Sequence, residues 1–69
     1  NMMTVFVLVG VIDYEFSDVL GVYATRQLAL EARDAYVARC EADTDFSMTD
    51  YDRYEVLPFE MNVAAGAVH

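Results

Sequence analysis

The run Thr4–Ile12, TVFVLVGVI, constrains the fold more than any other part of this 69-residue chain. It is apolar at almost every position, whereas a strand with one face in water alternates apolar and polar residues. Its length and its many β-branched residues favour a strand over a helix. The odd-numbered valines then point to one side, Phe6, Leu8 and Ile12 point to the other, and Gly10 marks a bulge or a close approach. Both faces therefore need cover, in a chain with little else to provide it.

A polar segment, Asp13–Asp18, follows this run and separates it from a second apolar run, Val19–Ala24. Two apolar runs joined by a short polar segment predict a β-hairpin. Thr25 can then cap a helix, because its hydroxyl can accept a hydrogen bond from a backbone N–H of the first turn. The next residues, Arg26–Ala42, are rich in Ala, Leu, Arg and Glu, which favour the helix.

A third strand is expected at Tyr51–Met61. Pro58 places this strand at an edge of the sheet or ends it, because proline has no N–H to donate. The order β-β-α-β predicts an α+β fold, a two-layer sandwich of one helix on a three-stranded antiparallel sheet. We expect residues 2–62 to form this single domain and residues 63–69 to be a flexible C-terminal tail.

The predicted helix carries apolar residues on two sides. Leu30 and Val37 fall on one side and have no evident partner within the chain, so we expect them to face away from the sheet. The broader face, expected to pack on the sheet, holds Leu28, Ala29, Ala32, Ala35, Tyr36 and Cys40.

Charge limits the classes of partner. Twelve acidic residues against four arginines give a net charge of −8, which disfavours direct binding to nucleic acid and to acidic membranes. A protein partner with a basic surface is favoured, although net charge also serves solubility alone. Cys40 is the only cysteine, so no disulfide forms within the chain, and a lone thiol suits a reducing, cytoplasmic location.

No catalytic, cofactor-binding or metal-binding pattern emerges. The segment 43–49 resembles the start of a calcium loop, but Met48 stands where that loop needs glycine. Loop solvation and helix capping explain its polar residues better. Cys40 lies far in sequence from the only histidine, His69, so a cysteine nucleophile is unsupported. We expect a protein that is not an enzyme and that uses no cofactor.

Self-association would solve the problem of the two-faced strand. Small domains often add a partner subunit, because a chain this short buries only about 60% of its unfolded surface. The tail could cover the second face, the run could be less regular than its sequence indicates, or a second copy could pack on it or extend the sheet edge to edge. We expect a homodimer, the commonest closed oligomer. The residues expected to mediate it are Leu30, Val37, Tyr14 and Tyr51.

The acids gather in two segments, one in the hairpin and one between the helix and the last strand. Carboxylates grouped in this way can steer and hold a basic partner. The residues expected to bind such a partner are Asp13, Glu15, Asp18, Asp43, Asp45, Asp50 and Asp52.

Two motifs resemble those of known small proteins. GVYAT, Gly21–Thr25, precedes the Ala-rich helix, and YDRYEVLPFEMN, Tyr51–Asn62, closes the patterned part of the chain. In this order they resemble a group of small bacterial and phage proteins that have no assigned activity, with a GVYSS-like strand end and a YEV-type final strand. The resemblance covers most of Val5–Asn62. It implies the β-β-α-β order and carries over no functional residue.

In its small size, its acidity and its phage-like motifs, the chain resembles small phage inhibitors of bacterial defence, including anti-CRISPR proteins. The resemblance implies a phage-encoded protein-binding module that inhibits a defence complex such as CRISPR-Cas, by protein contact or by nucleic-acid mimicry. The alternative is a structural or assembly domain that forms homodimers and has no inhibitory role.

Overall fold

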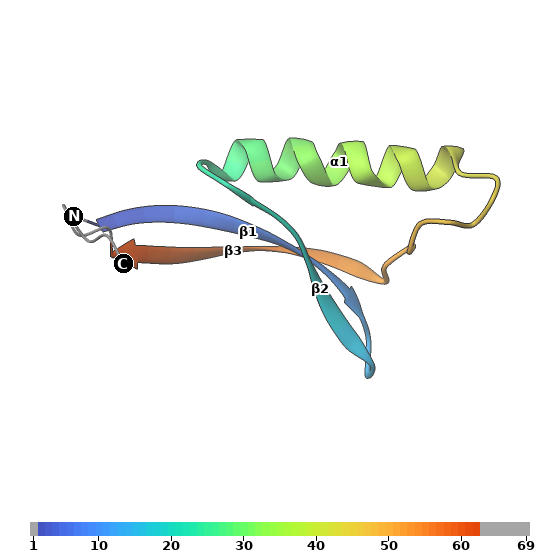
Figure 1. Ribbon diagram of the computed structural model, residues 1–69, viewed down its shortest axis with the longest axis horizontal. Helices are drawn as coiled ribbons and strands as arrows, with labels where there is room; N and C mark the ends of the chain where they lie inside the picture. The colour runs from blue at the N-terminus through green and yellow to red at the C-terminus, as the bar shows by residue number, and fades with distance from the viewer. Residues whose placement is uncertain (1, 63–69) are drawn as a thin grey trace, which may run out of the picture.

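The computed structural model describes residues 2–62 and arranges them as a three-stranded antiparallel sheet with one helix on one of its faces (Figure 1). The prediction of an α+β fold in the order β-β-α-β is confirmed. The expected tail, 63–69, lies outside the described residues. Within 2–62, no helix is both long and apolar enough to cross a membrane. The elements are β1 (Met2–Ile12), β2 (Phe16–Tyr23), α1 (Arg26–Ala42) and β3 (Arg53–Asn62).

The apolar strand β1 lies in the centre of the sheet, between β2 and β3. Its pairing with β3 runs over almost its whole length, whereas its pairing with β2 begins only at Phe6. Residues 2–5 therefore pair with β3 alone, and the two strands continue as a two-stranded ribbon beyond the end of β2 (Figure 1). The molecule is elongated as a result, with extents of 47 × 25 × 20 Å.

The hairpin turn is shorter than the sequence indicates. β2 begins at Phe16 rather than Val19, because Tyr14 takes a left-handed backbone conformation (φ 66°) that helps reverse the chain in a tight turn. The backbone N–H of Glu15 donates to the carbonyl of Ile12 at 3.1 Å and closes this turn. The polar residues at the start of β2 are therefore strand residues, which the sequence pattern hides.

The edge strands are both irregular. In β2, Val19 pairs with Val9 and Gly21 pairs with Leu8, so Leu20 is an extra residue that forms a β-bulge. In β3, Pro58 lies in the middle of the strand, and the prediction that this strand is at an edge is confirmed.

The helix begins at the predicted residue, and the Oγ1 atom of its N-cap Thr25 accepts a hydrogen bond from the backbone N–H of Leu28 at 3.1 Å. The stripe that faces the sheet is centred near Ala29, which is fully buried. Leu28 was expected on this stripe but is 47% exposed, because it lies one residue, about 100° of rotation, away from Ala29. Leu30 and Val37 do not face fully outward, since both are half-buried on one flank of the stripe.

Candidate protein-binding surfaces

The face of the sheet away from α1 is apolar, and no element of residues 2–62 covers it. Leu8 lines a cavity against α1, so the odd-numbered residues of β1 point to the opposite side. Cross-strand partners share a face, and Val7 pairs with Val22 and Leu57. We call this surface the open sheet face; its apolar members are Met3, Val5, Val7, Val9, Val11, Val19, Val22, Leu57, Phe59 and Met61.

The centre and the margins of the open sheet face differ in exposure. Val9 and Val11 are buried, because each lies between a neighbour on β2 and a neighbour on β3. The outer residues are not shielded, and together they expose on the order of 600 Å² of apolar surface, the upper end for a typical monomer. The exposed members are Met3, Val19, Val22, Leu57, Phe59 and Met61.

Charge on the open sheet face is balanced. The register adds Arg53 and Glu55 to this face, and Arg53 Nε lies 3.3 Å from Glu55 Oε2. Glu55 is the only one of the twelve acidic residues that the strand register places there. The protein therefore carries its excess negative charge on other surfaces.

On the helix side, three tyrosines pack on one another, and one of them lies against Gly10. The ring centroids of Tyr36, Tyr51 and Tyr54 are 5.8–6.0 Å apart. A Cβ atom on Gly10 would lie 2.5 Å from the nearest atom of the Tyr51 ring, so Gly10 marks a close approach and not the bulge. Tyr51 was expected at a self-association surface. That prediction is wrong, because the residue is 9% exposed and belongs to the core.

The hydroxyls of these tyrosines have structural roles. Tyr36 donates to the carbonyl of Thr49 at 2.7 Å, and burial raises the pKa of Tyr36 to about 12. Tyr51 donates to the Asp18 carboxylate at 2.5 Å, and this bond raises the pKa of Tyr51. Burial also raises the pKa of Tyr54, whose hydroxyl has no hydrogen-bond partner in the described structure. All three stay protonated at neutral pH.

The structure brings the hairpin acids and part of the second acidic group together. The Asp52 carboxylate accepts a hydrogen bond from the backbone N–H of Asp13 at 2.8 Å, across 39 positions in sequence. Asp13 in turn forms an ion pair with Arg53. These contacts hold the hairpin turn to the start of β3, so both acids stabilise the fold.

The segment 43–49 is a hydrogen-bonded loop. The Asp43 carboxylate accepts hydrogen bonds from the backbone N–H groups of Met48 (2.9 Å) and Asp45 (3.1 Å), which lower its pKa. These bonds lie within the loop, and the contact that caps the end of α1 is the backbone N–H of Asp43 donating to the carbonyl of Cys40 at 3.2 Å. Residues 2–62 contain no group of three or more His, Cys, Asp or Glu side chains placed to hold a metal ion. Among the seven acids expected to bind a partner, those whose side chains make no hydrogen bond or ion pair within 2–62 are Glu15, Asp45 and Asp50.

Two aromatic residues project from the loops. Tyr14, at the hairpin tip, is fully exposed, so it remains a candidate contact residue. Phe46 is 90% exposed and, like Tyr14, has a positive φ (54°). The sequence analysis missed Phe46 because a single aromatic residue in a polar loop gives no pattern.

Comparisons with known proteins return no match: no family model matches the sequence, no curated protein matches it, and no solved structure matches it.

Proposed function

We propose that this protein is a non-enzymatic protein-binding module that acts through the open sheet face, and that the face binds a second copy of the chain. The observation that carries the proposal is the group of six exposed, large apolar side chains on one side of the sheet. Apolar patches at this upper end of the monomer range are often functional.

Packing face to face is favoured over extension of the sheet at an edge. On β3, Pro58 interrupts the row of N–H donors that a new strand would need. On β2, the bulge at Leu20 twists the edge and interrupts its regular spacing. Neither of these edge irregularities obstructs packing on the open sheet face.

Charge and area favour a second copy as the occupant. Two chains of net charge −8 repel each other on most approaches, but the open sheet face pairs its one acid, Glu55, with Arg53. Two such faces bring together apolar surfaces with no excess charge. The exposed area approaches the roughly 800 Å² per partner of a standard interface, and aligned sheet-on-sheet packing is a common arrangement.

The experiment is light scattering at micromolar concentration, with the wild-type chain and two variants. The wild type is expected at twice its chain mass of 7.8 kDa. The double variant Val22→Thr/Phe59→Thr places β-branched, polar threonine at two exposed strand positions and should shift toward monomer. Leu28→Gln, which removes an exposed apolar side chain from the helix layer, should leave the dimer intact. A monomeric wild type at about 100 μM, where a dimer of about 1 μM Kd would persist, would refute the dimer.

A second candidate function is inhibition of a bacterial defence complex such as CRISPR-Cas in the cytoplasm. The observation that favours it is the exposed hairpin end, where Tyr14 stands between Asp13 and Glu15. Carboxylates on a rigid turn beside an exposed aromatic ring suit a basic channel built for nucleic acid.

This function is tested by the ability of the protein to block target-DNA binding by purified CRISPR effector complexes. The informative variant is Glu15→Gln/Asp45→Asn/Asp50→Asn, since these side chains make no hydrogen bond or ion pair within 2–62. It should lose inhibition, and inhibition by the wild type should weaken with salt. Glu31→Gln removes one negative charge from the helix and serves as the control for the loss of a single charge elsewhere on the protein. No inhibition of any effector by the wild type would remove this candidate and leave the dimer proposal unaffected.

A further inference from the structure

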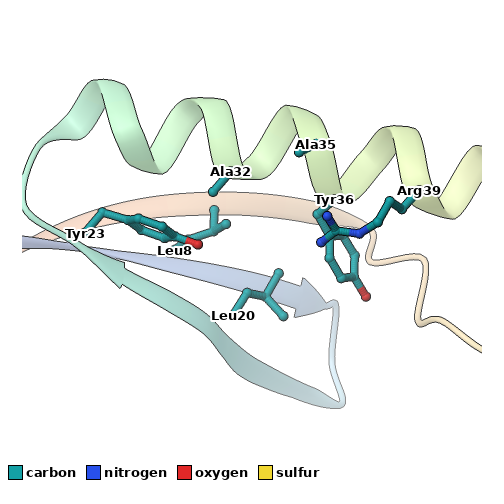
Figure 2. Close-up of a pocket in the computed structure, with 7 residues that line it drawn as sticks. All are labelled: Leu8, Leu20, Tyr23, Ala32, Ala35, Tyr36 and Arg39. Carbon is teal, nitrogen blue, oxygen red and sulfur yellow. The ribbon is translucent and has the colours of Figure 1, made fainter.

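A cavity of about 160 Å³ lies between α1 and β2, on the helix side of the sheet (Figure 2). It exists because the side chains that α1 contributes, Ala32 and Ala35, are small. The bulge turns Leu20 toward the same space. The lining residues are Leu8, Leu20, Tyr23, Ala32, Ala35, Tyr36 and Arg39.

Arg39 gives this cavity its chemical character. Its side chain extends from the last turn of α1 and lines the solvent-open side of the cavity, where Arg39 is exposed (Figure 2). The other three arginines have partners: Arg33 pairs with Asp34, Arg53 pairs with two carboxylates, and Arg26 stacks on an aromatic ring. Within the described part of the chain, Arg39 forms no ion pair. An arginine without a carboxylate partner within 2–62 is unexpected in a chain whose acidic residues outnumber its basic residues twelve to four.

A second polar group faces the same space. The hydroxyl of Tyr23 makes no hydrogen bond with any residue in 2–62, and Figure 2 shows it directed toward the centre of the cavity. Tyr36, by contrast, uses its hydroxyl on Thr49. The cavity thus offers apolar side chains and two donors that have no acceptor within 2–62, one of them the exposed cation of Arg39. An anionic group is the complement, and a carboxylate fits the planar guanidinium with two parallel hydrogen bonds.

Volume sets the size of the apolar part of the ligand. A cavity of about 150 Å³ lined by apolar side chains accommodates benzene, so this one holds a single ring or a branched chain of similar size. We propose that the cavity binds a small carboxylate that bears one aromatic ring or one branched aliphatic group, with the carboxylate on Arg39 and the apolar group between Leu8, Leu20 and Ala32. The proposal does not depend on the open sheet face, which lies on the other side of the sheet.

The test is a titration of the isotopically labelled protein with benzoate, phenylacetate and isovalerate, followed by two-dimensional NMR. At least one probe should give saturable shifts at residues of α1 and β2. Benzyl alcohol, which keeps the ring and lacks the charge, should bind at least about tenfold more weakly, since a hydrogen bond to a charged group is worth a factor of that order.

Variants separate this site from a structural role of Arg39 at the helix end. Arg39→Gln should weaken binding at least about tenfold, and Arg39→Lys, which keeps the charge but not the fork, should lie between it and the wild type. Arg33→Gln, on the same helix, should bind as the wild type does. Ala35→Leu should fill the cavity and abolish binding while the melting temperature holds.

Two outcomes would overturn the proposal. One is the absence of saturable shifts with every probe up to about 10 mM, ten times a millimolar Kd. The other is equal binding by Arg39→Gln and Arg33→Gln, which would leave Arg39 only its favourable interaction with the carbonyl end of α1.

Discussion

Gly10→Ala offers the sharpest test of how this small core is built. Gly10 lies in the central strand β1, and three atoms of the Tyr51 ring lie 2.5, 2.6 and 2.8 Å from the place that a Cβ would take. Carbon atoms in contact need about 3.5–4.0 Å, so the ring must move by about 1 Å. It cannot move alone, because its hydroxyl is bonded to Asp18 and its faces meet Tyr36 and Tyr54.

The expected cost follows from those contacts. Overpacking in a core costs about 1–3 kcal/mol, and weakening the bond from Tyr51 to the Asp18 carboxylate adds about 1–2 kcal/mol. The lower entropy of the unfolded chain with alanine returns about 0.4–1 kcal/mol. We therefore expect a net loss of about 1–5 kcal/mol in the free energy of unfolding, centred on about 3 kcal/mol, which lowers the melting temperature by at least about 4 °C in a domain of this size.

Thermal and urea denaturation, followed by circular dichroism, measure this loss. Gly21→Ala is the matched control: its Cβ meets only the far end of the Tyr23 ring, on an edge strand, where the ring can turn toward solvent. Its cost should stay below about 1 kcal/mol. In a Tyr51→Leu background, Gly10→Ala should lose most of its effect. A neutral or stabilising Gly10→Ala in the wild-type background would refute the close approach of ring and strand.

Three smaller predictions concern single side chains. Thr25→Ala removes the acceptor for the N–H of Leu28 and should lower helix stability by about 1 kcal/mol, seen as a lower melting temperature. Tyr54→Phe removes a buried hydroxyl without a partner in 2–62 and should raise the melting temperature by a few degrees, about 1 kcal/mol. The hydrogen bonds that lower the pKa of Asp43 below its ordinary 3.8 stabilise the fold while the carboxyl is ionised, and this stabilisation is lost as the pH falls through the lower pKa of the folded state. In melts across that pH range, the melting temperature of Asp43→Asn should therefore fall less steeply with acid than that of the wild type.

The order of the elements could be predicted because each has its own local pattern. The apolar run gave β1, and the helix-forming composition after Thr25 gave α1 with its first residue correct. Pro58, whose missing N–H is a local property, left an edge strand or a strand end as alternatives, and the structure has the edge strand. These features depend on a few neighbouring residues, so no knowledge of the tertiary structure was needed.

What failed depends on contacts between distant residues. The start of β2 was placed three residues late, since Phe16 begins the strand only because Tyr14 adopts a left-handed conformation. Tyr51 was assigned to the surface, because its burial requires Gly10, 41 positions away in sequence, to leave room for the ring. The rotation of α1 was misjudged because its stripe of alanines is nearly symmetric. Periodicity alone could not rank Leu28 against Leu30.

Among the candidate surfaces, too, those with a local sequence pattern could be predicted and those formed by distant residues could not. The two-faced character of β1 was visible in the sequence, and the open sheet face is its consequence. The cavity beside Arg39 could not be predicted from the sequence, because it arises where the bulge on β2 meets the alanines of α1. The sequence showed the two acidic segments, but it did not show that Asp52 accepts a hydrogen bond from the backbone of Asp13 or that Asp13 pairs with Arg53.

The small size of the core links folding to the proposed dimer. The buried apolar residues within 2–62 are Leu8, Val9, Val11, Ala29 and Tyr51. Only three of them lie between the helix and the sheet, because Val9 and Val11 belong to the open sheet face. A second copy on that face would cover the two valines together with the exposed margin around them, and so would add a second core to the first. In the proposed dimer, the apolar second face of β1 would be buried as well, and the apparent stability of the fold would rise with protein concentration.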